Sequence, residues 1–186
     1  APRDIKPGNL RVDRDGVVKI LDMGLARFFE DESDHLTRRQ DPGGVMGTAD
    51  YISPEQLIDC SGADHRTDIW ALGCILFELC TGQPPFVGAT LPEICTRILN
   101  APPTPLAELF PAAPVELQAA IARCLEKTPE NRFQNLGELA SAVAALGGEE
   151  AMRSASTIRH VIGLGADPQL ASGRVSTQPW SSVPLP

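Results

Sequence analysis

Apolar residues gather in a few blocks along the chain, and most of these blocks predict helices. Residues 68–80 are apolar nearly all round, which is typical of a helix buried inside a domain. These thirteen residues are too few to cross a bilayer, so we interpret the block as the core helix, with Asp68 as its N-cap. Apolar residues at helical spacing predict further helices over residues 91–100, 115–127 and 136–146.

Near the start of the chain, the pattern changes to short apolar runs that predict a β-hairpin. Residues 17–21 (Val-Val-Lys-Ile-Leu) have the composition of a buried strand, and residues 10–12 offer its partner. The Asp-Arg-Asp-Gly sequence between them is typical of a turn. Asp22 follows the second strand directly, so the hairpin carries this carboxylate back toward the residues that precede the first strand.

The segment before the hairpin is a polar loop. Pro7 prevents a regular helix and biases Lys6 toward an extended backbone, so Asp4, Lys6 and Asn9 are displayed on a loop. Phosphoryl transfer needs an acceptor for a hydroxyl proton, a cation that offsets phosphoryl charge, and an oxygen ligand for Mg²⁺. The loop supplies all three groups, and the hairpin adds Asp22, so the sequence predicts one site.

These stretches together resemble a known family. Arg-Asp-Ile-Lys-Pro-Gly-Asn at residues 3–9, followed by a hairpin and Asp-Met-Gly at residues 22–24, resembles the catalytic loop and metal-binding turn of protein kinases. The lysine two positions after the aspartate resembles the serine/threonine kinases of the bacterial type. The resemblance implies a protein kinase-like fold, in which a mainly α-helical large lobe carries a small β-hairpin at the catalytic site.

The resemblance also implies roles for the loop residues. Asp4 would orient the substrate hydroxyl and accept its proton, while Lys6 would offset charge on the γ-phosphoryl group of ATP. Asn9 and Asp22 would hold Mg²⁺, and Lys6, Asn9 and Asp22 together would bind the nucleotide. ATP and Mg²⁺ are therefore the expected cofactors, and proteins with accessible Ser or Thr are the expected substrates.

A third motif, Gly-Thr-Ala-Asp-Tyr-Ile-Ser-Pro-Glu at residues 47–55, resembles the substrate-docking loop and the end of the kinase activation segment. The resemblance implies that Thr48 is a catalytic residue that hydrogen-bonds near the loop aspartate and lysine. It implies that Glu55 forms a buried ion pair with a distant arginine, a position that Arg132 fits. It further implies that Asp68 accepts backbone N–H groups from the catalytic loop, so the last three residues have structural roles.

Residues 25–46 are rich in charge and turn formers, and in a kinase they would lie in the activation segment. Thr37 is our candidate phosphosite, because a phosphate there could pair with Arg3 and neighbouring arginines and order the loop. The alternative is that Thr37 is an ordinary surface threonine.

The resemblance divides the chain into two parts. Residues 1–146 are predicted to be the C-terminal lobe fragment of a kinase domain, from the catalytic loop to the last helix. Kinases carry a Gly-rich loop, a strand lysine and a helical glutamate upstream of this loop, so an N-terminal lobe is expected but missing. Residues 147–186 contain Gly, Ser and Pro with scattered apolar residues, and we predict a disordered tail there.

Charge and cysteine content restrict the classes of partner that the protein could bind and the compartment in which it could lie. A net charge of −8 and a pI near 4.8 argue against a protein that binds nucleic acid or an anionic membrane through a general basic field. The sequence contains no apolar run of the length that a membrane-spanning helix requires. Five cysteines without a C-x-x-C pair fit reduced thiols, so we predict a cytoplasmic protein.

Two classes of function remain open. The first is a serine/threonine protein kinase, inactive as this isolated chain, and the second is a pseudokinase-like scaffold or protein-binding module. The presence of Asp4, Lys6, Asn9 and Asp22 favours the enzyme. Pro2 stands where kinases usually have His, and together with the missing lobe it favours the scaffold.

Overall fold

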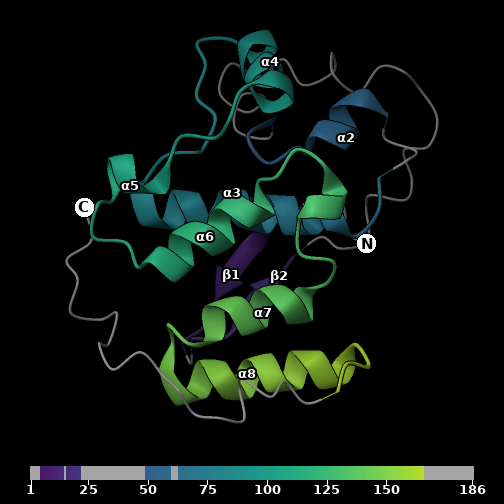
Figure 1. The fold of residues 1–186 in the computed structure, drawn as a ribbon, viewed down its shortest axis with the longest axis vertical. Coiled ribbons are helices and arrows are strands. Elements are labelled where there is room, and N and C mark those ends of the chain that lie inside the picture. The colour runs from purple at the N-terminus through teal and green to yellow at the C-terminus, as the bar shows by residue number, and fades with distance from the viewer. Residues whose placement is uncertain (1–4, 15, 22–48, 60–62, 166–186) are drawn as a thin grey trace.

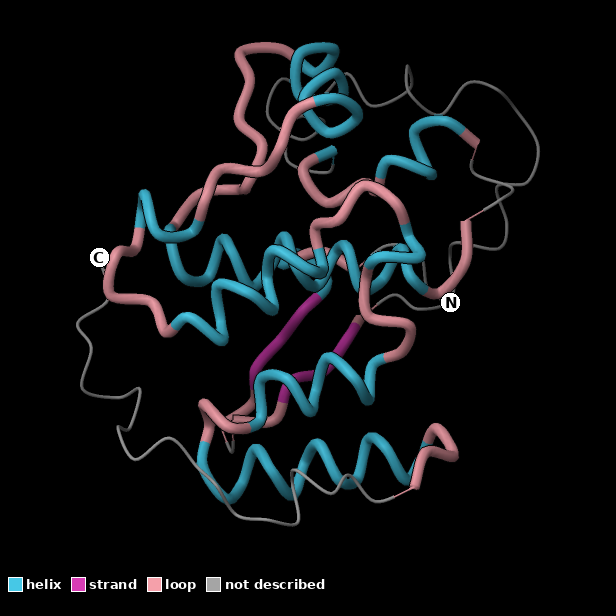
Figure 2. Tube along the Cα trace, in the orientation of Figure 1, coloured by secondary structure: helices cyan, strands magenta, loops and turns pink. Residues whose placement is uncertain are grey.

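The computed structural model describes residues 5–14, 16–21, 49–59 and 63–165 of the chain. These residues form a mainly helical structure with a two-stranded antiparallel sheet (Figure 1, Figure 2). In chain order the elements are η1 (Pro7–Asn9), β1 (Leu10–Val12), β2 (Val18–Ile20), α2 (Pro54–Ile58), α3 (Arg66–Thr81), α4 (Leu91–Asn100), α5 (Leu106–Leu109), α6 (Val115–Cys124), η4 (Pro129–Asn131), α7 (Leu136–Ala144) and α8 (Gly148–Val161).

Helix α3 is the hydrophobic axis of the described structure, as the sequence predicts. It runs across the middle of the ribbon, with α6 packed along it (Figure 1). Its side chains enter three separate hydrophobic clusters, through Trp70, Ile69 and Ile75 respectively. Trp70 and Ile69 are both 0% exposed. Apolar neighbours on several sides explain why this stretch is apolar nearly all round.

The predicted N-cap of α3 is wrong. The helix begins at Arg66, and Asp68 lies buried in its first turn. Asp64 causes the earlier start, because its carboxylate accepts a hydrogen bond from the Arg66 backbone N–H at 2.8 Å. Its carbonyl oxygen accepts another from the Thr67 hydroxyl at 2.8 Å. The sequence offers two aspartates within five residues, and the first of them satisfies the free N–H groups at this end of the helix.

The three amphipathic helices are confirmed as α4, α6 and α7. The structure ends α6 at Cys124 and α7 at Ala144, a few residues before the predicted ends. The short helix α5 lies within the proline-rich segment that joins α4 to α6. Within the described ranges, the helices are too short or too polar to span a membrane.

The predicted hairpin is also confirmed, with Leu10 opposite Ile20 and Val12 opposite Val18. Its turn is closed by Asp13, whose carboxylate accepts a hydrogen bond from the Val17 backbone N–H at 2.9 Å. The expectation that the second strand is buried is wrong, because Val18 is 58% exposed and Ile20 is 40% exposed. Leu10 packs against the cluster of Ile5, Ala71 and Ile75, whereas little of the described chain covers the rest of the sheet.

The prediction of a disordered tail from residue 147 is wrong over α8 (Gly148–Val161). This helix packs beside α7, and Ala155 at its centre is only 2% exposed (Figure 1). Gly148 has φ +71°, a left-handed conformation that reverses the chain between the two helices. Gly147 is the N-cap of α8, and Gly148 is its first residue. Residues 166–186 lie outside the described residues.

We predict that Gly73→Ala destabilises the protein, because Gly73 lies where α3 and α6 cross. An added Cβ would lie 2.5 Å from the Cβ of Cys124, which is bonded directly to the α6 backbone and cannot rotate away. Overpacking of this kind costs about 1–3 kcal/mol and outweighs a gain of up to about 1 kcal/mol in helix propensity.

Urea unfolding checks this result, with Gly8→Ala as the control, since an added Cβ there meets nothing within 4 Å. Equal or greater stability of Gly73→Ala would contradict the packing described at this crossing.

Candidate active site

The catalytic-loop segment is anchored to α3 through Ile5. This side chain is 8% exposed and packs with Ala71 and Ile75 of the helix. Lys6 then has an extended backbone (φ −151°, ψ 158°), as the proline after it predicts, and the 3-10 turn η1 follows. The Asn9 backbone N–H donates to the Lys6 carbonyl at 2.9 Å. Lys6 and Asn9 are therefore held on a short turn, with both side chains partly exposed.

The hairpin returns the chain to this turn. At its base, the Leu21 backbone N–H donates to the Asn9 carbonyl at 2.7 Å. Leu10 beside it packs against the same cluster that holds Ile5. The sequence predicts that the hairpin carries Asp22 back toward Asp4 and Asn9, and the structure shows Leu21, the residue before Asp22, hydrogen-bonded to Asn9. Asp4, Asp22, Thr37 and Thr48 lie outside the described residues, so their positions stay predictions.

The structure contains the ion pair expected between Glu55 and Arg132. The two guanidinium nitrogens Nη1 and Nη2 each donate to a different carboxylate oxygen at 2.7 Å. The Arg132 side chain is 0% exposed and that of Glu55 is 19% exposed. Burial acts to raise the pKa of Glu55, but hydrogen bonds from Arg132 and from the backbone outweigh it and hold the pKa below its usual value. Glu55 is therefore ionised at neutral pH.

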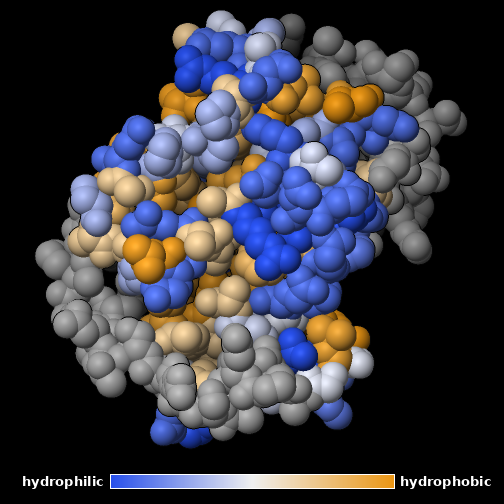
Figure 3. All heavy atoms as spheres, in the orientation of Figure 1, coloured by the Kyte–Doolittle hydropathy of each residue, from blue (hydrophilic) through white to orange (hydrophobic). Residues whose placement is uncertain are grey.

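Arg132 uses its remaining N–H groups on backbone carbonyls. Nε donates to Glu126 at 2.8 Å, Nη1 to Arg66 at 3.0 Å and Nη2 to Lys127 at 3.2 Å. One buried guanidinium thus connects α2, the start of α3 and the segment that follows α6. Figure 3 shows a hydrophilic surface over the segment that follows α6.

Ser53 fixes the position of Glu55 from the other side. It is the N-cap of α2 and is 0% exposed, and its backbone N–H donates to Gln56 Oε1 at 3.0 Å. This capping arrangement holds Glu55 in the first turn of the helix, facing Arg132. Ser53 and Pro54 thus connect the end of the predicted activation segment to the buried pair.

Sequence reasoning missed a contact between Tyr51 and Glu78. The Tyr51 hydroxyl donates to Glu78 Oε2 on α3, and the ring packs against two of the hydrophobic clusters. Burial and then this hydrogen bond raise the pKa of Tyr51, and burial followed by the Glu78 charge raises the pKa of Asp50. The signal was present in the sequence as a single glutamate inside an otherwise apolar helix. The contact holds the predicted docking loop against α3.

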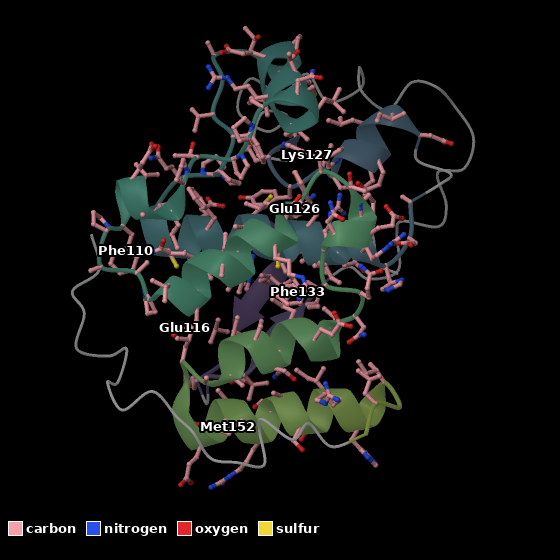
Figure 4. The ribbon with its side chains drawn as sticks, in the orientation of Figure 1. Phe110, Glu116, Glu126, Lys127, Phe133 and Met152 are labelled. Carbon is pink, nitrogen blue, oxygen red and sulfur yellow. The ribbon has the colours of Figure 1, made fainter. Side chains whose placement is uncertain are left out.

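Asp68 is buried in the first turn of α3 and takes part in the hydrogen-bonding or electrostatic contacts of that region. Its predicted acceptance of N–H groups from the catalytic loop stays a prediction. Lys127, which the sequence analysis did not single out, lies beside Trp70 and Phe86 of the core. Figure 4 shows it between α4 and the end of α6.

Comparison with known proteins gives a consistent result. Residues 2–143 match the protein kinase domain family. A probable serine/threonine-protein kinase of Corynebacterium efficiens is 35% identical over 157 residues, which are 82% of this chain and 23% of that protein. The serine/threonine-protein kinase PknB of Mycobacterium tuberculosis is 36% identical over 137 residues, 74% of this chain and 21% of that protein. The chain spans about a fifth of the length of these relatives.

We predict that Arg132→Met destabilises the protein by about 3–5 kcal/mol, because it leaves the buried Glu55 carboxylate without its partner. Arg97→Met is the matched control, since Arg97 is 50% exposed and pairs with Glu93 on the surface of α4. An exposed pair of this kind contributes only about 0–1 kcal/mol. Urea unfolding of both variants makes the comparison, and similar losses in the two would contradict a dominant role for the buried pair.

Proposed function

Because the chain belongs to the protein kinase family, we propose that it is the catalytic-loop part of a serine/threonine kinase that transfers the γ-phosphoryl group of ATP to protein hydroxyls. The observation that carries this proposal is the hydrogen bond between the Leu21 N–H and the Asn9 carbonyl. It ties the end of the catalytic loop to the residue before Asp22. This contact supports the proposal that the two metal ligands, Asn9 and Asp22, act at one place.

In the proposed reaction, Asp4 orients the substrate hydroxyl and accepts its proton as the oxygen attacks the γ-phosphorus. The bond between that phosphorus and the bridging oxygen of ADP breaks in the same transfer. Lys6 offsets the charge on the migrating group, and Thr48 hydrogen-bonds beside both residues. The Lys6 side chain is partly exposed on an extended stretch of backbone, which suits a cation that must reach a bound nucleotide.

Asn9 and Asp22 fit a site for Mg²⁺, because an amide oxygen and a carboxylate are ligands that this ion accepts in nucleotide sites. Asn9 sits at the end of a 3-10 turn that is held at both ends by backbone hydrogen bonds, so its side chain starts from a fixed point. When bound, Mg²⁺ neutralises charge on the ATP phosphates.

The exposed apolar hairpin supports an N-terminal lobe as a further part of the active enzyme. Val12, Val18 and Ile20 are each at least 40% exposed, an arrangement that a strand-rich lobe packed above the sheet would bury. The proposed division places residues 1–146 in the kinase domain, with α8 attached to its last helix. Thr37 remains the proposed phosphosite of the activation segment.

The proposed location is the cytoplasm, where ATP and Mg²⁺ are available and thiols stay reduced. The described cysteines are free, and three of them, Cys74, Cys80 and Cys124, are buried. The alternative function, a pseudokinase-like scaffold, is favoured by Pro2 in place of the usual His.

We predict that Asp4→Ala and Asp22→Ala each reduce phosphorylation of a generic Ser/Thr protein substrate at least about 100-fold once the chain is joined to a complete N-terminal lobe. Glu116→Ala is the control, because Glu116 is an exposed carboxylate on α6. Radiolabelled γ-phosphate transfer provides the measurement. Near-parental transfer by either aspartate variant would contradict its proposed role, and an inactive parent fusion would favour the scaffold.

We also predict that the chain by itself does not bind Mg-ATP appreciably. A nucleotide site of this class is built between two lobes. The Gly-rich loop and the strand lysine of the N-terminal lobe supply many of the contacts with the phosphates. Thermal unfolding with millimolar Mg-ATP tests this, because ligand at a hundred times its Kd stabilises by about 2.7 kcal/mol. A saturable rise of several degrees in Tm, absent with Mg²⁺ alone, would contradict the prediction.

A further inference from the structure

Lys127 occupies an unusual position for a lysine. Its Nζ donates to the Ile98 carbonyl near the end of α4 at 2.6 Å. It lies 4.0 Å from the centre of the Phe86 ring and 5.1 Å from that of Trp70, and these two rings are stacked on each other. Lys127 is only partly exposed (Figure 4). The amine therefore links the end of α4 to the aromatic core, although Ile98 and Lys127 are 29 residues apart in sequence.

The charged group that Lys127 faces is another cation. The Arg132 guanidinium lies 5.0 Å from the same Trp70 ring, and its Nη2 donates to the Lys127 carbonyl at 3.2 Å. Within the described part of the chain, carboxylates lie beyond ion-pair distance of the Lys127 amine. Burial raises the pKa of the nearby Cys74 thiol, so this group is neutral at physiological pH. The two aromatic faces and the Ile98 carbonyl oxygen favour the ammonium form.

We propose that Lys127 is a proton-sensitive tether that couples the Glu55–Arg132 ion pair to the packing of α4. The neutral amine favours the buried position against Ile98, Phe86 and Trp70, and the protonated amine favours water. Loss of the Glu55 charge would leave Arg132 uncompensated, which makes a second buried cation less favourable. The end of the activation segment would then control how firmly α4 is held.

The direction of the pH effect follows from the environment of the amine. Burial lowers the pKa of Lys127 to about 8, and the charge of Arg132 acts in the same direction. An exposed lysine has a pKa of about 10.4, so the buried position binds its proton roughly 250-fold more weakly. Between these two values the buried amine is neutral while the solvated one is still protonated. The tether therefore strengthens as the pH rises through about 8 and weakens as the pH falls.

The direction of this pH effect distinguishes the tether from an ordinary surface lysine. The inference does not depend on the proposed phosphoryl transfer. Ile94 and Ile98 are the buried side chains of α4, with 3% and 0% exposure. They hold the helix against the core whether or not the Lys127 amine is protonated. The expected change is therefore local opening of the end of α4 and not global unfolding.

The chain has three lysines, Lys6, Lys19 and Lys127, so ¹³Cε-lysine labelling gives a simple NMR spectrum of the whole protein. Signals are assigned with Lys127→Met and Lys19→Gln. We expect the Lys127 signal to titrate near pH 8, well below the ordinary lysine pKa of about 10.4. In Glu55→Gln the Lys127 midpoint should fall further, while Glu116→Gln, which removes an exposed carboxylate on α6, should leave it unchanged.

Hydrogen exchange provides the second readout. After correction for intrinsic rates, amide protection at the end of α4 should rise severalfold between pH 7 and pH 9 in the wild type, with α7 as the internal reference. Lys127→Met should remove this pH dependence. Titration of Lys127 near the ordinary lysine pKa of about 10.4 would overturn the proposal. So would pH-independent α4 protection in the wild type or unchanged pH dependence in Lys127→Met. If Glu55→Gln fails to fold, these wild-type and Lys127→Met results still decide.

Discussion

One buried guanidinium determines how the separate parts of this structure fit together. Arg132 has no exposed surface, and its hydrogen bonds reach the Glu55 carboxylate and the carbonyls of Arg66, Glu126 and Lys127. A buried charge is tolerated only where its donors are satisfied and an opposite charge lies beside it. Both conditions are met here by segments that are far apart in sequence. The start of α3, the segment after α6 and the start of α2 can therefore adopt only a narrow set of relative positions.

The consequences extend in two directions along α3. Toward its N-terminal half, Arg132 lies over Trp70, which stacks on Phe86 and brings in Lys127 and α4. Next to Trp70 in the sequence, Ala71 and then Ile75 one turn further along hold Ile5, which anchors the catalytic-loop segment. The proposed chemistry and the proposed docking surface thus share one support. A change at the ion pair is expected to reach both, because α3 connects them as a rigid element.

Local patterns in the sequence were sufficient for the hairpin, for α4 and for the central helix, since each depends on residues close together in the chain. The motif spacing also located Glu55 and Arg132, although only the resemblance to kinases could pair two residues so far apart. Three features could not be predicted in this way. The start of α3 depends on which aspartate closes the first turn, and the exposure of the hairpin depends on what packs above it. Helix α8 is stabilised mainly by its contact with α7, and its scattered apolar residues give only a weak periodic signal.

A double-mutant cycle on Glu55 and Arg132 tests this account most directly. The stability of Glu55→Gln, Arg132→Met and the combined variant is measured by urea unfolding at neutral pH. If the pair is the constraint described here, the double variant loses about 2 kcal/mol less than the sum of the single losses, because each single variant leaves its partner buried and unpaired. Losses that add to within about 0.5 kcal/mol would show that the two side chains act independently, and the central role given to the pair would be wrong.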